Sequence, residues 1–163
     1  MMRAHQPLPD WQVRRWLNSD HDLNLTDLRG RIALIHAFQM FCPGCAQHSV
    51  PQAERMHRAL GGPDFVVIGV HTVFEQRERA TDKALAAFLR EQRISHPIGV
   101  DRSEPGQRLP CTLRDWGLRG TPSLLLLDRE GRLRAHRFGT VPDLDLKSMI
   151  RVLRAEPGGD LRK

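Results

Sequence analysis

Residues 32–45, IALIHAFQMFCPGC, decide the fold that this sequence predicts. Their first seven residues form a nearly continuous apolar run, which is typical of a strand that is covered on both faces of a sheet. A C-x-x-C pair, Cys42 and Cys45, follows the run and opens a stretch with apolar residues at helical spacing as far as Leu60. Gly61-Gly62 ends that stretch. The two cysteines are therefore predicted to lie between a buried strand and the start of a helix.

Strand-like and helix-like segments alternate along the rest of the chain. Residues 65–70 and 123–127 are apolar runs that predict two more buried strands, and residues 132–138 are expected to form a hairpin with the second of them. Thr81 is the expected N-cap of a second helix, and a final helix is expected to start near Asp143. This order predicts an α/β fold in which helices flank a central mixed β-sheet.

The length and the absence of a dividing linker predict one domain over residues 1–163. Its core is expected at about residues 28–154, and residues 156–163, which contain Pro-Gly-Gly, are expected to form a loose tail. No run of 18 apolar residues occurs, so membrane insertion is not expected. The polar N-terminal segment lacks the apolar core of a signal peptide, which predicts a cytoplasmic protein, or a periplasmic one if a leader has been removed. We expect a monomer.

The charge balance bears on the partners of the protein. Lysine and arginine outnumber acidic residues by 25 to 19, which gives a formal charge of +6, but the arginines are scattered along the chain without a basic block. Nucleic-acid binding needs basic residues clustered on one face or along one helix. We therefore expect a solvated, arginine-rich surface and no nucleic-acid partner, although a preference for acidic partners is compatible with the excess charge.

The cysteines indicate redox chemistry. Three are too few for a disulfide scaffold, and two of them form Cys42-Pro43-Gly44-Cys45. A thiol at a helix N-terminus faces unpaired backbone N–H groups and the positive end of the helix dipole, which favour thiolate over thiol. Pro43 suits the first helical turn because its missing N–H has no partner there in any case. Cys42 is therefore the expected nucleophile and Cys45 the thiol that resolves the mixed disulfide.

Two segments of the sequence resemble the signatures of thioredoxins. Residues 35–45 are similar to the strand and active-site segment of that family, and residues 118–127, followed by Glu130-Gly131, are similar to its cis-proline strand and β-hairpin. The long connection between residues 70 and 122 and the N-terminal extension look like the TlpA/ResA-like branch of thiol-disulfide oxidoreductases. The resemblance implies a thioredoxin-like fold with an N-terminal extension and a central insertion.

The resemblance also implies roles for individual residues. Pro122 would be cis and face the cysteine pair, and Thr121 would offer backbone groups to a bound substrate strand. Clients would be proteins that contain disulfides or dithiols, with an upstream thiol donor. No organic cofactor or metal is implied, because the Cys42–Cys45 dithiol carries the electrons. Glu75 resembles an acidic residue near the active site of some relatives, and an exposed loop glutamate is the alternative.

The sequence departs from the thioredoxin pattern at three places. His36 occupies the strand position that is often a buried acid, so it is either a base or proton relay for Cys45 or a hydrogen-bonded core histidine. The dipeptide between the cysteines is Pro43-Gly44, rather than Gly-Pro. Pro51 lies six residues after Cys45, one later than is usual, which leaves the register of the first helical turns open.

Three alternative functions need to be weighed. A zinc site could use Cys42, Cys45 and His48 with Cys111 or His36, although structural zinc usually has a second close ligand pair. A peroxiredoxin would carry Thr or Ser three positions before the cysteine, where this chain has Gln39. A non-catalytic binding module would have no reason to keep the cysteine pair. Cys111 is expected to be a small core or loop thiol, with a third redox partner as the alternative.

Overall fold

Strand β2 (Ile32–Phe38) is the central strand of the molecule. All seven of its residues are buried in the computed structural model, which describes residues 5–157. β2 pairs in parallel with β3 (Phe65–His71) on one side and antiparallel with β5 (Ser123–Leu127) on the other. Strands with sheet neighbours on both sides and helices on both faces have no solvent-facing side, which explains why these runs are apolar without alternation.

The sheet has six strands in the order β1-β4-β3-β2-β5-β6. β6 (Leu133–Phe138) closes the hairpin with β5, as the sequence predicted. In the inserted region, β4 (Ile98–Asp101) runs parallel to β3, and β1 (Val13–Leu17) pairs with it antiparallel at the edge. The mixed α/β architecture predicted from the sequence is thus confirmed, and the N-terminal extension supplies one of its strands.

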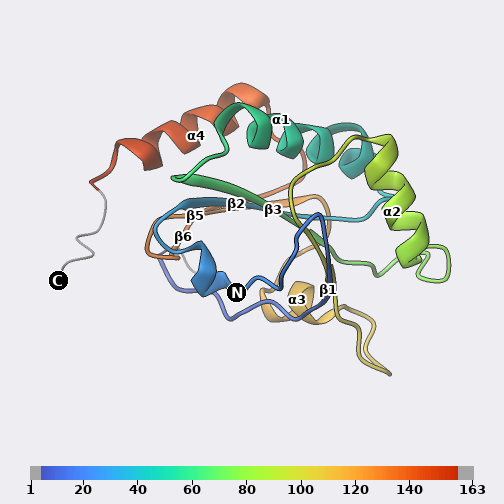
Figure 1. Cartoon of the computed structure of the whole chain (residues 1–163). Coiled ribbons are helices and arrows are strands. Elements are labelled where there is room, and N and C mark those ends of the chain that lie inside the picture. Colours follow the sequence, from blue (N-terminus) through green and yellow to red (C-terminus); the bar gives the residue numbers. More distant parts are fainter. Residues whose placement is uncertain (1–4, 158–163) are drawn as a thin grey trace.

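Helices cover both faces of the sheet (Figure 1). α1 (Val50–Leu60) and α4 (Asp143–Ala155) lie side by side over one face, and α2 (Asp82–Glu91) lies beside them. α2 begins at the predicted N-cap, because the Thr81 side chain accepts a hydrogen bond from the backbone N–H of Ala84 at 3.1 Å. The short helix α3 (Cys111–Asp115) and the 3-10 turn at Leu25–Leu28 lie on the opposite face.

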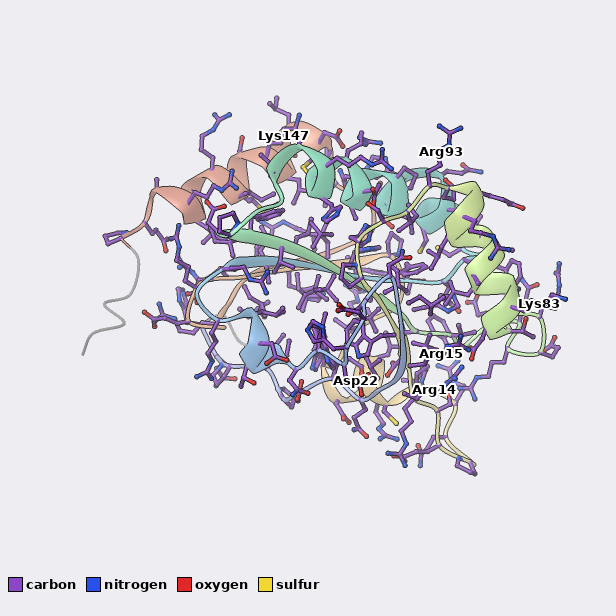
Figure 2. All side chains as sticks on the ribbon, viewed as in Figure 1. Arg14, Arg15, Asp22, Lys83, Arg93 and Lys147 are labelled. Carbon is purple, nitrogen blue, oxygen red and sulfur yellow. The ribbon has the colours of Figure 1, made fainter. Side chains whose placement is uncertain are left out.

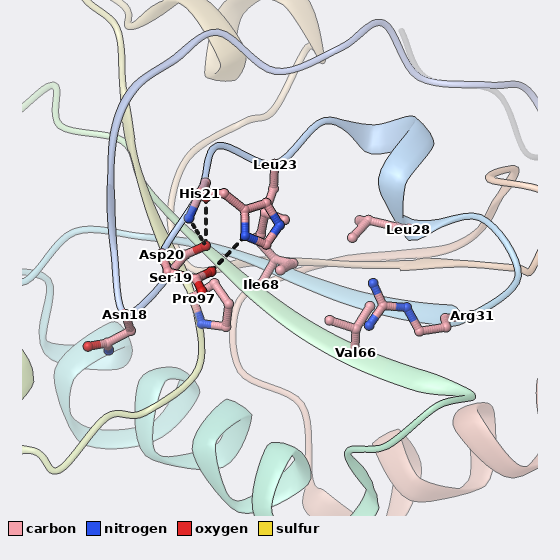
Figure 3. Close-up of a pocket in the computed structure, with 10 residues that line it drawn as sticks. All are labelled: Asn18, Ser19, Asp20, His21, Leu23, Leu28, Arg31, Val66, Ile68 and Pro97. Carbon is pink, nitrogen blue, oxygen red and sulfur yellow. Dashed lines mark hydrogen bonds and ion pairs between the residues drawn. The ribbon is translucent and has the colours of Figure 1, made fainter.

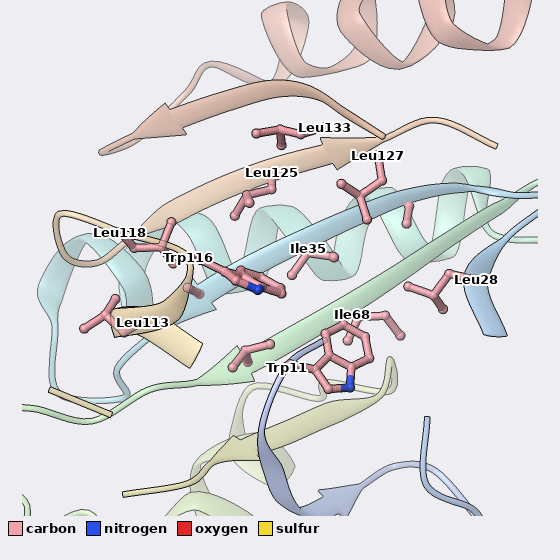
Figure 4. Packing of buried hydrophobic residues seen from close by; sticks show 13 residues of the cluster. Trp11, Leu28, Ile35, Ile68, Leu113, Trp116, Leu118, Leu125, Leu127 and Leu133 are labelled. Atoms are coloured by element: carbon pink, nitrogen blue, oxygen red, sulfur yellow. The ribbon is translucent and has the colours of Figure 1, made fainter. Parts of the chain in front are cut away.

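The N-terminal extension belongs to the core beneath that opposite face. Trp11 and Trp116 are buried there among leucine and isoleucine side chains (Figure 4). The Trp11 indole donates to the carbonyl of Leu23, and the Trp116 indole donates to the carbonyl of Pro9, both at 2.8 Å. The packed core therefore begins well before residue 28, where the sequence placed its start. Of the predicted tail, residues 158–163 lie outside the described residues.

Charged side chains are spread over the surface. Lys147 on α4 and Lys83 on α2 project from different sides of the molecule (Figure 2). This distribution agrees with a solvated arginine-rich surface and with the lack of a basic block in the sequence. Among residues 5–157, no helix combines the length and apolar character needed to cross a bilayer.

Gly69 on β3 has no room for a side chain. A Cβ atom there would lie 2.6 Å from Cδ1 of Ile98 and 2.7 Å from Nε2 of His36. We expect Gly69→Ala to lower the free energy of unfolding by about 1–3 kcal/mol, because packed neighbours must move. Gly62→Ala is the matched control, since nothing lies within 4 Å of its Cβ position. Chemical denaturation of both variants checks the prediction, and equal stabilities would contradict it.

Candidate active site

The cysteine pair lies at the end of β2, where the chain turns into a helix. Helical structure begins at Pro43, so Cys42 immediately precedes the first turn, and its carbonyl accepts from the N–H of Ala46 at 2.9 Å. Cys42 is partly exposed, whereas Cys45 is completely buried, and both are free thiols. The Cys42 sulfur can therefore contact a second molecule, whereas the Cys45 sulfur is shielded from solvent.

The first turns of this helix are wider than an α-helix. Cys45–Ser49 forms a π-helical segment in which the N–H of Val50 donates to the carbonyl of Cys45, and α1 follows at Val50. A π-turn accommodates one residue more than an α-turn. The extra residue that places Pro51 late in the sequence is thus absorbed between Cys45 and α1. Pro51 then falls just after the junction at which the π-helical segment passes into α1.

A cis-proline loop faces the cysteines, as predicted. The Thr121–Pro122 peptide bond is cis. The Cys42 thiol lies 3.7 Å from the carbonyl oxygen of Thr121, and Cδ of Pro122 would lie 3.5 Å from a Cβ at Gly44. The cis-proline ring thus lies within van der Waals distance of the start of the helix. Cys42 is therefore held against the backbone of the loop.

Burial sets the chemistry of Cys45. Loss of solvation, with the neighbouring Cys42 thiol adding to it, raises the pKa of the Cys45 thiol to about 12. A thiol with such a pKa is protonated and unreactive at neutral pH. Cys45 must therefore lose its proton to a neighbouring group when it acts, and the two sulfurs are suited to different steps.

Gln39 joins three segments around the cysteines. Its side chain is 4% exposed, and its amide nitrogen donates to Oγ1 of Thr121 at 3.0 Å. Its amide oxygen accepts from the backbone N–H groups of Phe74 and Glu75, both at 3.1 Å. Its own carbonyl accepts from the N–H of Cys42 at 3.0 Å. Gln39 was not predicted as a site residue, because side-chain partners that lie 35 to 82 positions away leave no local signal in the sequence.

Replacing Gln39 by leucine should loosen this arrangement. Two backbone N–H groups and one hydroxyl lose their buried partner, each at about 1–3 kcal/mol, so we expect lower stability and about a tenfold lower kcat/KM for a disulfide peptide. Gln52→Leu is the control, because Gln52 is equally buried but bonds Val141 and Asp143. If Gln52→Leu lowers kcat/KM as much as Gln39→Leu does at the same loss of free energy of unfolding, Gln39 has no specific role at the site.

His36 takes part in a buried chain of polar side chains. Its Nε2 lies 2.8 Å from Nε2 of His96, and Nδ1 of His96 lies 2.8 Å from Oε1 of Glu54 on α1. Burial lowers the pKa of both histidines. Although burial opposes ionisation of Glu54, hydrogen bonds from His96, Ser95 and Arg58 hold the pKa of its carboxyl well below the usual range. The chain therefore contains a carboxylate and two neutral imidazoles.

These charges determine where the protons lie. The Glu54 carboxylate accepts the Nδ1 proton of His96, so Nε2 of His96 accepts the proton on Nε2 of His36. Nδ1 of His36 is then left as an acceptor, and this buried atom has no hydrogen-bond partner among residues 5–157. Of the two roles predicted for His36, that of a hydrogen-bonded core histidine agrees with this geometry, and its partner is another imidazole. A role as base or proton relay for Cys45 stays a prediction.

A second buried histidine supports the loop before Cys42. The backbone N–H of Met40 donates to Nε2 of His71 at 3.2 Å, and the His71 ring contacts Phe38 with their centroids 5.0 Å apart. Burial lowers the pKa of His71 to about 4. The neutral imidazole that this hydrogen bond requires is therefore the state present at neutral pH.

The comparison with known proteins places this geometry in a family. The model of the AhpC/TSA family matches residues 4–136. The chain belongs to the AhpC/TSA family. Within the thioredoxin superfamily its relatives place it in the TlpA/ResA-like branch, and it is a thiol-disulfide oxidoreductase by family.

Two solved structures resemble this AhpC/TSA family member over nearly their whole length. A thioredoxin-like superfamily protein is 46% identical with a TM-score of 0.89, and the match covers 93% of this chain and 98% of that chain. A thiol-disulfide isomerase from Corynebacterium glutamicum is 42% identical with a TM-score of 0.88, covering 93% and 97%. Both confirm the thioredoxin-like fold.

Two curated relatives are more distant. The thiol:disulfide interchange protein DsbE of Allochromatium vinosum is 26% identical over 83% of this chain and 67% of that protein. The chloroplastic protein SUPPRESSOR OF QUENCHING 1 of Arabidopsis thaliana is 25% identical over 88% of this chain, which spans only 13% of its length. This AhpC/TSA family chain thus corresponds to a small part of one of these proteins.

In this AhpC/TSA family member, the side chains of the other candidate residues, Glu75, Cys111 and His48, form no hydrogen bond to Cys42 or Cys45 within residues 5–157. The Glu75 side chain is exposed in the loop after β3, and only its backbone N–H bonds Gln39. Cys111 is buried at the start of α3, with its thiol 3.4 Å from Oε1 of Glu104. Nε2 of His48 lies 2.8 Å from the carbonyl of Val141. Residues 5–157 contain no group of three His, Cys, Asp or Glu side chains placed to hold a metal.

A cavity of about 390 Å³ lies between the loop at residues 18–23 and the sheet (Figure 3). Val66 and Ile68 of β3 form its apolar floor, and Arg31 and His21 lie at its rim. Neither cysteine of the pair lines it. This cavity is therefore separate from the cysteine pair.

Proposed function

We propose that this protein exchanges electrons reversibly with disulfides of client proteins through the Cys42–Cys45 pair. One observation carries the proposal: a partly exposed Cys42 thiol precedes a helix and lies 3.7 Å from the Thr121 carbonyl, while Cys45 is completely buried behind it. This division between an accessible and a hidden sulfur is what a two-step exchange requires.

The exchange has two balanced steps. The Cys42 thiolate attacks one sulfur of the client disulfide, the client S–S bond breaks, and one client thiolate leaves as the Cys42–client mixed disulfide forms. Cys45 then gives up its proton and attacks Sγ of Cys42, which releases the second client thiolate and forms the Cys42–Cys45 disulfide. Two electrons pass from the dithiol to the client, both client thiolates gain a proton, and an upstream thiol donor restores the dithiol.

The experiment for the proposed function compares two oxidants. The reduced protein is mixed with a disulfide peptide or with an organic hydroperoxide, and loss of its thiols is followed over time. We expect fast oxidation by the disulfide and slow oxidation by the hydroperoxide, because Gln39 stands where a peroxidase would have a hydroxyl residue. Faster turnover with the hydroperoxide would replace the proposal with a peroxidase.

A further inference from the structure

Two exposed phenylalanines flank the redox site. Phe41, directly before Cys42, is 38% exposed, and Phe138, at the end of β6, is 49% exposed. Phe138 lies beside the cis-proline loop, because its Cε1 would be 3.4 Å from a Cβ at Gly120. Within residues 5–157, only two other large apolar side chains are as exposed, Leu144 and Val152, both on α4. Exposed aromatic side chains that gather at a reactive site indicate a contact surface.

An arginine guanidinium group stacks over each of these two rings. The guanidinium carbon of Arg79 lies 4.9 Å from the centroid of Phe41, and that of Arg119 lies 5.3 Å from the centroid of Phe138. Nη1 of Arg79 donates to Oε1 of Gln76 at 2.7 Å. Stacking on a ring holds a cation beside an apolar surface, while the N–H groups without another partner remain available to a carboxylate. In the part of the chain that the structure describes, neither arginine forms an ion pair.

Within residues 5–157, several other arginines form ion pairs, and others, such as Arg90 and Arg151, form neither an ion pair nor a stack on an aromatic ring. Arg14 is paired with Asp82, and Arg55 is paired with Asp143 at 2.8 Å. The two arginines at the redox site have their positive charge uncompensated, whereas Glu75 is an exposed carboxylate in the loop that Gln39 joins to the site. The same loop also carries a second exposed carboxylate, Glu78. The surface beside Cys42 offers two cations that are stacked on aromatic rings, and these favour a partner that is apolar and negatively charged.

We propose that the pairs Phe41–Arg79 and Phe138–Arg119 form a docking surface for client segments whose cystine is flanked by acidic residues. This inference rests on the proposed function. Apolar parts of the segment would contact the two rings, and Asp or Glu side chains next to the cystine would pair with the guanidinium groups. The attraction accelerates encounter and selects the partner more than it adds affinity.

The test uses three disulfide substrates. Two are peptides of the same length, one with Asp and Glu and one with Lys and Arg beside the cystine, and the third is a small uncharged disulfide. We expect kcat/KM to be at least about tenfold higher for the acidic peptide at low ionic strength, with the difference shrinking as salt is added. The double variant Arg79→Glu, Arg119→Glu should reverse the preference and leave the small disulfide unaffected.

The control carries the same charge change elsewhere. Arg90 on α2 and Arg151 on α4 are exposed, so Arg90→Glu, Arg151→Glu alters the net charge equally without touching the rings. If this control reverses the preference as well, net charge and not the docking surface selects clients, and the proposal is wrong. An equal rate for both peptides also overturns it. If the unmodified protein fails to reduce even the small disulfide, the proposed function itself fails.

Discussion

Replacing Cys42 by serine is expected to abolish disulfide exchange, with a loss of at least about a thousandfold, whereas Cys45→Ser is expected to trap the client. Cys42 is the accessible sulfur, and without it no mixed disulfide can form. Without Cys45 the first step still occurs, but no intramolecular thiol releases the client, and this loss of proximity is large. Non-reducing gel electrophoresis and mass spectrometry of the adducts, together with steady-state rates, measure both effects.

Cys111→Ser is the control for these variants. Cys111 is buried in α3 and its thiol contacts Glu104, so its loss should leave the exchange rate within about twofold. Equal residual activity in Cys42→Ser and Cys45→Ser would contradict the division of roles. Client adducts that map to Cys111 would also contradict it, because a third redox thiol would then be present.

The second large effect is a loss of stability in mild acid. The pKa of His71 falls from about 6.5 in an unfolded chain to about 4 in the folded protein because the ring is buried. Between these values the unfolded state binds more protons than the folded state. The free energy of unfolding is therefore highest, as far as His71 is concerned, above about pH 6.5, and it falls as the pH decreases toward 4. His71 alone should remove about 3 kcal/mol over this range, and His36 and His96 act in the same direction.

Urea denaturation at several pH values between 7.5 and 4 measures this loss. His71→Gln should give a flatter curve, because its amide oxygen can still accept from the N–H of Met40 but cannot bind a proton in this range. His21→Gln is the control, since the His21 ring is 68% exposed and its replacement should leave the slope unchanged. A free energy of unfolding that stays constant from pH 7 to pH 4.5 would show that the buried histidines do not resist protonation.

Much of the fold was predictable because it depends on local patterns. The apolar runs of β2, β3 and β5, the N-cap Thr81 and the hairpin after residue 127 are each readable within a few residues. β1 was not predicted as a strand, because Val13–Leu17 lies at the edge of the sheet and contains exposed arginines. Edge strands with charged residues give only a weak strand signal.

The geometry of the candidate site was predictable where a motif marks it. Cys42, Cys45 and the cis-proline at residue 122 follow from two short segments. The surrounding network did not follow, because Glu54, His96 and His36 come from three distant segments and each would suit a solvated or core position alone. The π-helical turn is an intermediate case, since the late Pro51 indicated a change of register but not how the chain would absorb it.

The central claim is that Cys42 and Cys45 form a reversible disulfide with each other. The most direct measurement equilibrates the protein across a series of glutathione redox ratios, alkylates the free thiols and maps the products by mass spectrometry. We expect one two-electron transition that links Cys42 to Cys45, while Cys111 stays alkylated at every ratio. A pair that remains alkylated throughout, or a disulfide that includes Cys111, would contradict the claim.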